Sequence, residues 1–176
     1  EILAMPEVTV RPVNPGRMLD EVRVIMDIFN DAWSENWGFV PLSQSELAKM
    51  AADLKLILVP ELTFIVSING EPAAVALALP NINDLVRDFD GKLSVFTIPK
   101  LLWRLKVNGA KSGRLIILGV RKKYRNVRRF MGLSAYLYVA MNHAAQKLGM
   151  THGELGWTLE DNAAINSGIR LMGGRV

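Results

Sequence analysis

An apolar strand-sized run, a basic turn and a long helical pattern together form the segment best suited to bind an anion. The run Arg114–Val120 predicts a strand, and the spacing of apolar residues over Val127–Leu148 predicts a helix. Six basic residues lie within nine positions at their junction: Arg121, Lys122, Lys123, Arg125, Arg128 and Arg129. A tight strand-to-helix turn directs backbone N–H groups to one point, where the helix dipole favours negative charge. The sequence therefore predicts a phosphate or pyrophosphate site, with a solvated basic turn as the alternative.

Groups that could move a proton lie within this segment and just beyond it. Carboxylates can act as general bases and phenols as general acids. The candidates are Glu154, Glu160, Asp161, Tyr136 and Tyr138. We select Glu154 as the base, because it opens a strand predicted over Glu154–Leu159, and Tyr138 as the acid. A solvated carboxylate at a strand edge is an equally good interpretation of Glu154.

Two motifs in this order resemble those of the GNAT superfamily of acyl-CoA N-acyltransferases. That family carries Arg/Gln-x-x-Gly-x-Gly/Ala at the start of a helix, and this chain has Arg129-Phe130-Met131-Gly132-Leu133-Ser134. The preceding Gly119-Val120 with Tyr124-Arg125 is similar to the Val-x-x-x-Tyr-Arg that often comes before the motif. More residues than usual separate Arg125 from Gly132. A register starting at Arg125 is the alternative, and it would place Arg128 and Phe130 at the glycine positions.

The second motif follows the next predicted strand. Asn162 matches the asparagine that contacts the pantetheine arm of CoA in the family, although it could also simply cap the helix predicted over Asp161–Met172. The ending Leu171-Met172-Gly173-Gly174 resembles the end of the last helix in these enzymes. The two motifs lie about one helix and one strand apart, as they do in the family.

The resemblance implies a mechanism and a set of binding residues. Acetyl-CoA or another acyl-CoA would be the co-substrate, and a small amine, an amino acid or a peptide would accept the acyl group. The strand backbone would orient the thioester, a β-bulge would splay the strand from its neighbour, and the helix start would hold the pyrophosphate. The implied cofactor residues are Leu118, Gly119, Val120, Arg125, Arg129, Phe130, Met131, Gly132, Leu133, Ser134 and Asn162. The implied acceptor residues are Trp33, Trp37 and Phe39.

Two departures from the family keep a second function open. Many members carry a tyrosine seven residues after the asparagine, and Ile169 stands there in this chain. Members also continue with a further strand after the Gly-Gly, whereas this chain stops at Val176. The alternative is therefore a GNAT-like domain without catalysis that has a binding or structural role.

The remaining elements predict the sheet that positions these motifs. Asn69-Gly70 between two apolar runs predicts a hairpin over Leu62–Leu79. Ser43 with Glu46 predicts a capped helix after the aromatic loop that follows the first helix. The expected order is strand, two helices, hairpin, a short helical segment, strand, helix, strand and helix. This order predicts an α/β (α+β) fold with a mixed, mostly antiparallel central sheet flanked by helices, lacking the family's last strand.

Composition limits the other possibilities. The chain has no cysteine and two histidines, so we expect no metal site, and no apolar run approaches the length of a membrane span. We expect one domain over residues 1–176, cut from a longer cytoplasmic protein, with no membrane partner. A basic RNA-binding module fits the net charge of +4, but no stacking aromatic residues interleave with the basic run. A homodimer is left open.

Overall fold

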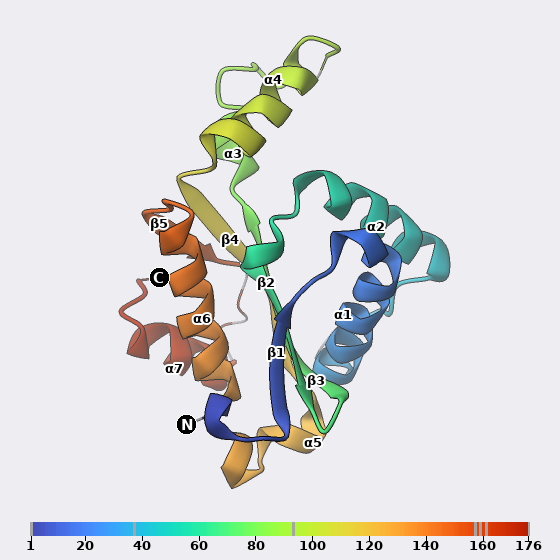
Figure 1. The fold of residues 1–176 in the computed structure, drawn as a ribbon, viewed down its shortest axis with the longest axis vertical. Helices are drawn as coiled ribbons and strands as arrows, with labels where there is room; N and C mark the ends of the chain where they lie inside the picture. Colours follow the sequence, from blue (N-terminus) through green and yellow to red (C-terminus); the bar gives the residue numbers. More distant parts are fainter. Residues whose placement is uncertain are drawn as a thin grey trace.

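A five-stranded sheet with helices on both faces forms the centre of the protein (Figure 1). The structure is a computed structural model that describes residues 2–36, 38–92, 94–156, 158, 160 and 162–175. The strand order is β1-β2-β3-β4-β5, and every pair is antiparallel except the parallel pair β4–β5. One hydrophobic core lies between the sheet and α1 and α2, and a second lies between the sheet and α6. This arrangement confirms the predicted fold class.

The order of elements also agrees with the prediction. The strands are β1 (Val8–Pro12), β2 (Thr63–Ile68), β3 (Glu71–Pro80), β4 (Ser112–Val120) and β5 (His152–Leu155). The α-helices are α1 (Met18–Trp33), α2 (Gln44–Ile57), α3 (Ile82–Leu85), α4 (Thr97–Trp103), α5 (Lys122–Arg125), α6 (Leu133–Lys147) and α7 (Ala163–Leu171). Shorter turns are η1 (Ile2–Ala4), η2 (Pro15–Arg17), η3 (Pro60–Leu62), the π-helical η4 (Arg104–Asn108) and η5 (Arg128–Phe130).

Local signals set several of these elements. Asn69 and Gly70 both have positive φ, 51° and 80°, as the predicted hairpin turn between β2 and β3 requires. Ser43 and Glu46 form the predicted capping box at the start of α2. In the middle of the sheet, the small residues 73–76 of β3 are fully buried. Their small volume lets the helices of both faces approach the sheet closely.

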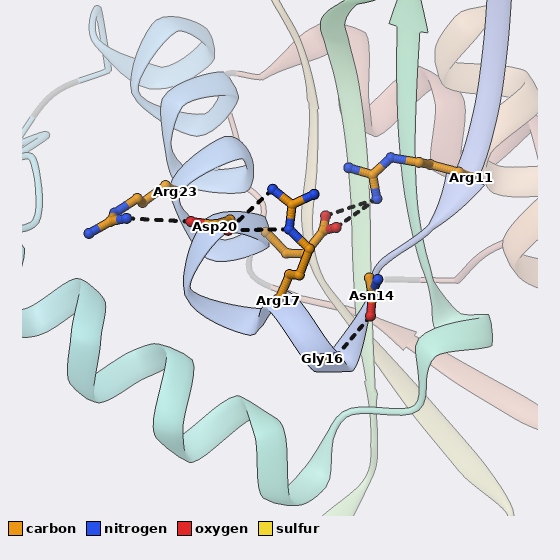
Figure 2. Close-up of polar contacts among 7 residues, drawn as sticks. Arg11, Asn14, Gly16, Arg17, Asp20 and Arg23 are labelled. Carbon is orange, nitrogen blue, oxygen red and sulfur yellow. Dashed lines mark hydrogen bonds and ion pairs between the residues drawn. The ribbon is translucent and has the colours of Figure 1, made fainter.

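Polar contacts secure the start of α1 (Figure 2). Asn14 Oδ1 accepts a hydrogen bond from the Gly16 N–H at 2.9 Å and caps η2. The buried carboxylate of Glu21 accepts two 2.9 Å hydrogen bonds from Arg11 on β1. Arg17 and Arg23 pair with Asp20 on the exposed side of the helix. These contacts fix α1 against β1, so that the other end of α1 lies over β4.

Two predicted boundaries are wrong. The helix predicted over Val127–Leu148 begins only at Leu133, because the 3₁₀ turn η5 comes before it and consecutive arginines oppose the positive end of a helix dipole. Its end is confirmed, since Gly149 has a φ of 74°. The strand predicted over Glu154–Leu159 runs instead from His152 to Leu155. Within the former range, Trp157 and Leu159 lie outside the described residues.

Between β3 and β4 the chain makes a long detour, which we call the α3–α4 excursion (residues 81–111). It contains α3, α4 and η4 and projects beyond the end of the sheet (Figure 1). The sequence predicted a short helical segment between the hairpin and the next strand, and the structure has α3 and α4 there.

Replacing Arg11 with Ala should leave the Glu21 carboxylate buried without its cation. We expect the free energy of unfolding to fall by about 2 kcal/mol, because the desolvated charge loses its partner while Arg11 itself is half-exposed. Urea denaturation measures the change. Arg17→Ala is the matched control: both members of its ion pair are exposed, so it should cost less than about 0.5 kcal/mol. Equal losses in the two variants would contradict this interpretation.

Candidate functional site

Strand β4 continues past the end of β5. All of β5 pairs with the first part of β4, from Ser112 with His152 to Leu115 with Leu155. The Gly156 N–H then donates a hydrogen bond to the Leu115 carbonyl at 2.8 Å. Beyond this point β4 pairs with β3 on one edge, and no strand of the described residues pairs with its other edge. We call the space beside this second edge the β4–β5 gap, with its closed end at Leu115 and its open end at Val120.

A β-bulge lies in β4 just past its last pair with β5. The register between β3 and β4 shifts from Leu77 with Ile117 to Ala78 with Leu115, so Ile116 is the extra residue. Bulges bend a strand and increase its local twist. The sequence resemblance implied such a bulge on this strand, close to Leu118, Gly119 and Val120, and the structure places it just before them.

The N-terminus of α6 lies at the open end of the same gap. Gly132 is the N-cap residue, and no side chain of the described residues accepts a hydrogen bond from the first turn. The first helical bond runs from the Tyr136 N–H to the Gly132 carbonyl, so the N–H groups of Leu133 and Ser134 come before it. A helix end with free donors and a positive dipole is suited to bind an anion.

The structure favours one of the two motif registers. Arg129, Gly132 and Ser134 span the entry into α6, as the family motif requires. Arg125 instead ends the short helix α5, and its guanidinium donates to the carbonyls of Val120 and Ala32. Arg125 therefore joins β4 to α1. Among the other motif residues, Phe130 packs edge-on against Tyr124, Leu133 is fully buried and Met131 is exposed.

Most side chains of the basic run have carboxylate partners in the structure. Carboxylates from distant parts of the chain pair with four of the six side chains: Arg121 with Asp27, Lys122 with Glu35, Lys123 with Glu71, and Arg129 with Glu7. Lys122 and Lys123 lower the pKa of Glu35 and Glu71, mainly through these hydrogen bonds. With Arg125 also engaged, Arg128 is the member of the run without a side-chain contact in the described part of the chain. It is exposed in η5, directly before α6.

Aromatic residues of α1 cover the opposite face of β4. A Cβ added at Gly119 would lie 2.5 Å from the Trp33 ring, so this glycine allows the indole to lie directly against the strand. Phe29 stacks on Trp33 with ring centroids 4.6 Å apart, and Phe39 lies 5.7 Å from Phe29. The predicted acceptor residues Trp33 and Phe39 thus join one aromatic cluster beside the open part of β4. Trp37 lies outside the described residues.

The predicted base and acid lie nearer the closed end of the gap. Glu154 pairs with Arg114 on β4 and also accepts a 3.2 Å hydrogen bond from Asn81, so both its oxygens are engaged. Tyr138 is buried on α6 beside Gly168 of α7, and burial raises the pKa of its phenol. The phenol therefore stays protonated at neutral pH. Both residues line a cavity of about 790 Å³ between β5, α6 and the end of α7, whose walls include Leu115, Met141 and Leu171.

Two residues of the second motif have clear structural roles. Asn162 Oδ1 accepts a hydrogen bond from the Ile165 N–H at 3.2 Å, which confirms it as the N-cap of α7. Ile169, at the position where a tyrosine is common in the family, is buried. Asp161 lies outside the described residues, and the described residues contain no strand after α7.

Sequence reasoning missed the group that sets the register of β4 against β5. The Arg114–Glu154 ion pair joins residues directly opposite in the parallel pairing, and Asn81 at the end of β3 completes it. The sequence did contain a signal of close pairing at this place. Gly156 is a glycine within an apolar strand pattern, and such a glycine often marks a close approach of two backbones. A Cβ there would lie 2.6 Å from the Leu115 carbonyl oxygen.

No metal site or membrane span is found in the described part of the chain. Its His, Asp and Glu residues form no group of three that could hold a metal ion. None of its helices is both long enough and apolar enough to cross a bilayer.

Sequence comparison finds two curated relatives. The chain is 39% identical over 167 residues to the bacterial ceramide synthase of Caulobacter vibrioides, covering 95% of this chain and 44% of that protein. It is 35% identical to protein YghO of Escherichia coli, covering 95% of this chain and 43% of the relative. The chain thus spans less than half the length of these relatives. No protein-family model matches it.

Comparison with solved structures identifies the fold. The aminoglycoside N-acetyltransferase AAC(6')-Iy in complex with CoA aligns with a TM-score of 0.61 at 13% identity, over 96% of this chain and 88% of that one. A possible acetyltransferase from Clostridium difficile aligns with a TM-score of 0.60 at 14% identity, over 96% and 91%. The chain has the GNAT acyltransferase fold, as the two sequence motifs implied.

Gly156→Ala should show that the close approach of β5 to β4 depends on a missing side chain. The added Cβ meets a backbone oxygen that cannot move without breaking the strand pairing, so we expect a loss of about 1–3 kcal/mol in unfolding free energy. Gly153→Ala on the same strand is the control, because its Cβ would lie at an ordinary 3.6 Å from the nearest atom. Thermal or urea unfolding distinguishes them, and a neutral Gly156→Ala would argue against the close approach.

Proposed function

We propose that the chain is an acyl-CoA-dependent N-acyltransferase domain. The observation that carries this proposal is the free edge of β4 beyond the bulge at Ile116, with the uncapped N-terminus of α6 at the open end of the gap. An extended pantetheine arm could pair with that strand edge as a missing strand would. The CoA pyrophosphate would then meet the N–H groups of Leu133 and Ser134. Solved structures with this fold hold CoA or a CoA-containing bisubstrate analog, which supports the proposal.

The remaining motif residues would assist this binding mode. Arg128 is exposed and carries no carboxylate partner in the described residues, so its charge is available to a phosphate. Asn162 uses its oxygen to cap α7, which leaves the amide nitrogen as the donor for a carbonyl of the pantetheine arm. Arg125 would act indirectly, by holding the end of β4 against α1.

Transfer would proceed by direct attack of an amine on the thioester carbonyl. The amine forms the new C–N bond, the C–S bond breaks, and the thiolate of CoA takes a proton. Tyr138 is our candidate donor, because it lines the cavity beside Leu115, where the paired part of β4 ends. Glu154 is our candidate for taking the proton of the amine. Both its oxygens accept hydrogen bonds in the free protein, so this role requires the contact with Arg114 or Asn81 to open when substrate binds.

The cavity next to Tyr138 suggests an acyl chain longer than acetyl. Its volume of about 790 Å³ and the apolar residues in its walls suit a fatty-acyl group. The cavity adjoins Leu115, the last residue of β4 that pairs with β5. The Caulobacter relative is named a ceramide synthase, and a ceramide is an amide of a fatty acid with a long-chain amino alcohol. We therefore propose a long-chain amine as the first acceptor to test and hexadecanoyl-CoA as the first donor.

A domain without catalysis is the second candidate function. It is favoured by the buried Ile169 at the position where the family often has a tyrosine.

Calorimetric titration with acetyl-CoA and hexadecanoyl-CoA, followed by an assay of CoA release, distinguishes the transferase from the domain without catalysis. Binding with turnover supports the transferase. Binding without turnover on any amine supports the second candidate, and no binding at millimolar concentrations contradicts both.

Ser134→Asp should weaken CoA binding without harming the fold. The new carboxylate would occupy the second position of α6, where the helix dipole stabilises it by about 0.3–1 kcal/mol. The same charge would repel the pyrophosphate, so we expect the CoA dissociation constant to rise at least about tenfold. Calorimetry and thermal unfolding measure the two effects together. Ser134→Asn, similar in size but neutral, should change the affinity far less, and equal affinities in both variants would disprove the pyrophosphate site.

Tyr138→Phe should lower kcat about a hundredfold while the KM for acyl-CoA changes little, since the variant loses only the proton donor. In the described part of the structure, the hydroxyl group has no hydrogen-bond partner, so stability should change little. Tyr136→Phe is the matched control, because burial also raises the pKa of this tyrosine but it does not line the cavity. CoA release provides the rate. If both variants retain full activity, Tyr138 is not the acid.

A further inference from the structure

The α3–α4 excursion exposes an unusual amount of apolar surface. Helix α4 has no buried residue, although its sequence is largely apolar. The exposed large apolar residues of the excursion are Val95, Phe96, Ile98, Trp103 and Val107. Phe96 is 84% exposed and Trp103 is 60% exposed, so two aromatic side chains stand largely in water. Exposed apolar residues gathered in one segment indicate a surface suited to contact another body.

Internal contacts hold the excursion in place. Asp88 pairs with both Lys100 and Arg104, and these two cations also lie over the ring of the buried Phe89, at 5.5 and 5.4 Å. Arg104 additionally donates to the Leu85 carbonyl. The two cations hold the pKa of the Asp88 carboxyl well below its usual range, mainly through these hydrogen bonds. The helices of the excursion are therefore tied to each other, and the excursion projects beyond the end of the sheet (Figure 1).

The charge of the excursion restricts what can cover it. Residues 81–111 contain six basic and three acidic side chains, so most of the protein's net charge of +4 lies here. Asp88 is neutralised by its partners, and Asp84 pairs with Arg87. Lys92, Lys106 and Lys111 are exposed, and no carboxylate of the described residues pairs with them. A segment that exposes apolar and aromatic side chains together with unpaired lysines is complementary to an anionic lipid surface.

We propose that the α3–α4 excursion docks the domain on an anionic bilayer, with Phe96 and Trp103 inserted at the headgroup level and the three lysines on the lipid phosphates. Aromatic residues of this kind concentrate at the membrane–water interface. The expectation of no membrane partner rested on the missing span, and a helix lying in the interface needs none. Docking here leaves the β4–β5 gap free, so the inference does not depend on the proposed chemistry.

Vesicle flotation tests the proposal. The full chain is mixed with vesicles of phosphatidylcholine alone or with phosphatidylglycerol added to about 30 mol%, a fraction that gives a strongly negative surface. We expect flotation with the anionic vesicles and at least about tenfold weaker partitioning into the neutral ones. The double variant Phe96→Ser/Trp103→Ser should reduce partitioning into anionic vesicles at least about tenfold, because it removes the two side chains that would enter the interface.

Matched variants distinguish docking through the excursion from a general effect of surface hydrophobicity. Val40→Ser/Leu56→Ser removes two side chains that are 77% and 60% exposed on other elements, and it should partition like the unmodified protein. Neutralising the lysines in Lys92→Gln/Lys106→Gln/Lys111→Gln should weaken binding to the anionic vesicles at least about tenfold. Absence of flotation, or equal losses in the two serine double variants, overturns the proposal. Loss of a dimer in Phe96→Ser/Trp103→Ser without vesicle binding also overturns it, in favour of a second copy of the chain.

Discussion

The short pairing between β5 and β4 is the constraint on which the rest of the structure depends. All of β5 pairs with the first part of β4, and β4 then continues from Ile116 to Val120. A bulge at Ile116 lies just past the last pair, and Gly156 permits the close approach there. In the described part of the chain, no strand pairs with this edge of β4 beyond Leu115. A strand edge left open inside a fold invites an extended ligand, and this is the physical basis of the proposed acyl-CoA site.

Contacts on three sides fix the elements around this edge of β4. On one face, Trp33 lies against Gly119 and packs α1 on the part of β4 beyond β5. At the open end of the gap, Arg125 joins the last carbonyl of β4 to α1, while α6 begins without a side-chain cap. At the closed end, Glu154 pairs with Arg114 directly across the paired strands.

The sequence predicted the parts of this arrangement that local chemistry determines. Asn69-Gly70 and the Ser43–Glu46 capping box each act within a few residues, and each was predicted correctly. The carboxylate partners of the basic run, such as Glu7 and Glu71, were not predicted because they are far away in sequence. The start of α6 was misread because apolar spacing continues through η5. Of the candidate site residues, the structure brings Trp33 and Gly119 together, whereas Glu154 and Tyr138 lie towards the closed end.

The central claim is that CoA lies along the open edge of β4 with its pyrophosphate at the start of α6. Hydrogen exchange with and without CoA tests this most directly, because such a binding mode specifies the amides that become protected. We expect slower exchange in the peptides that cover Leu118–Val120 and the first turn of α6, with little change in α2 or the α3–α4 excursion. Protection confined to other segments, or no change at saturating CoA, would contradict it.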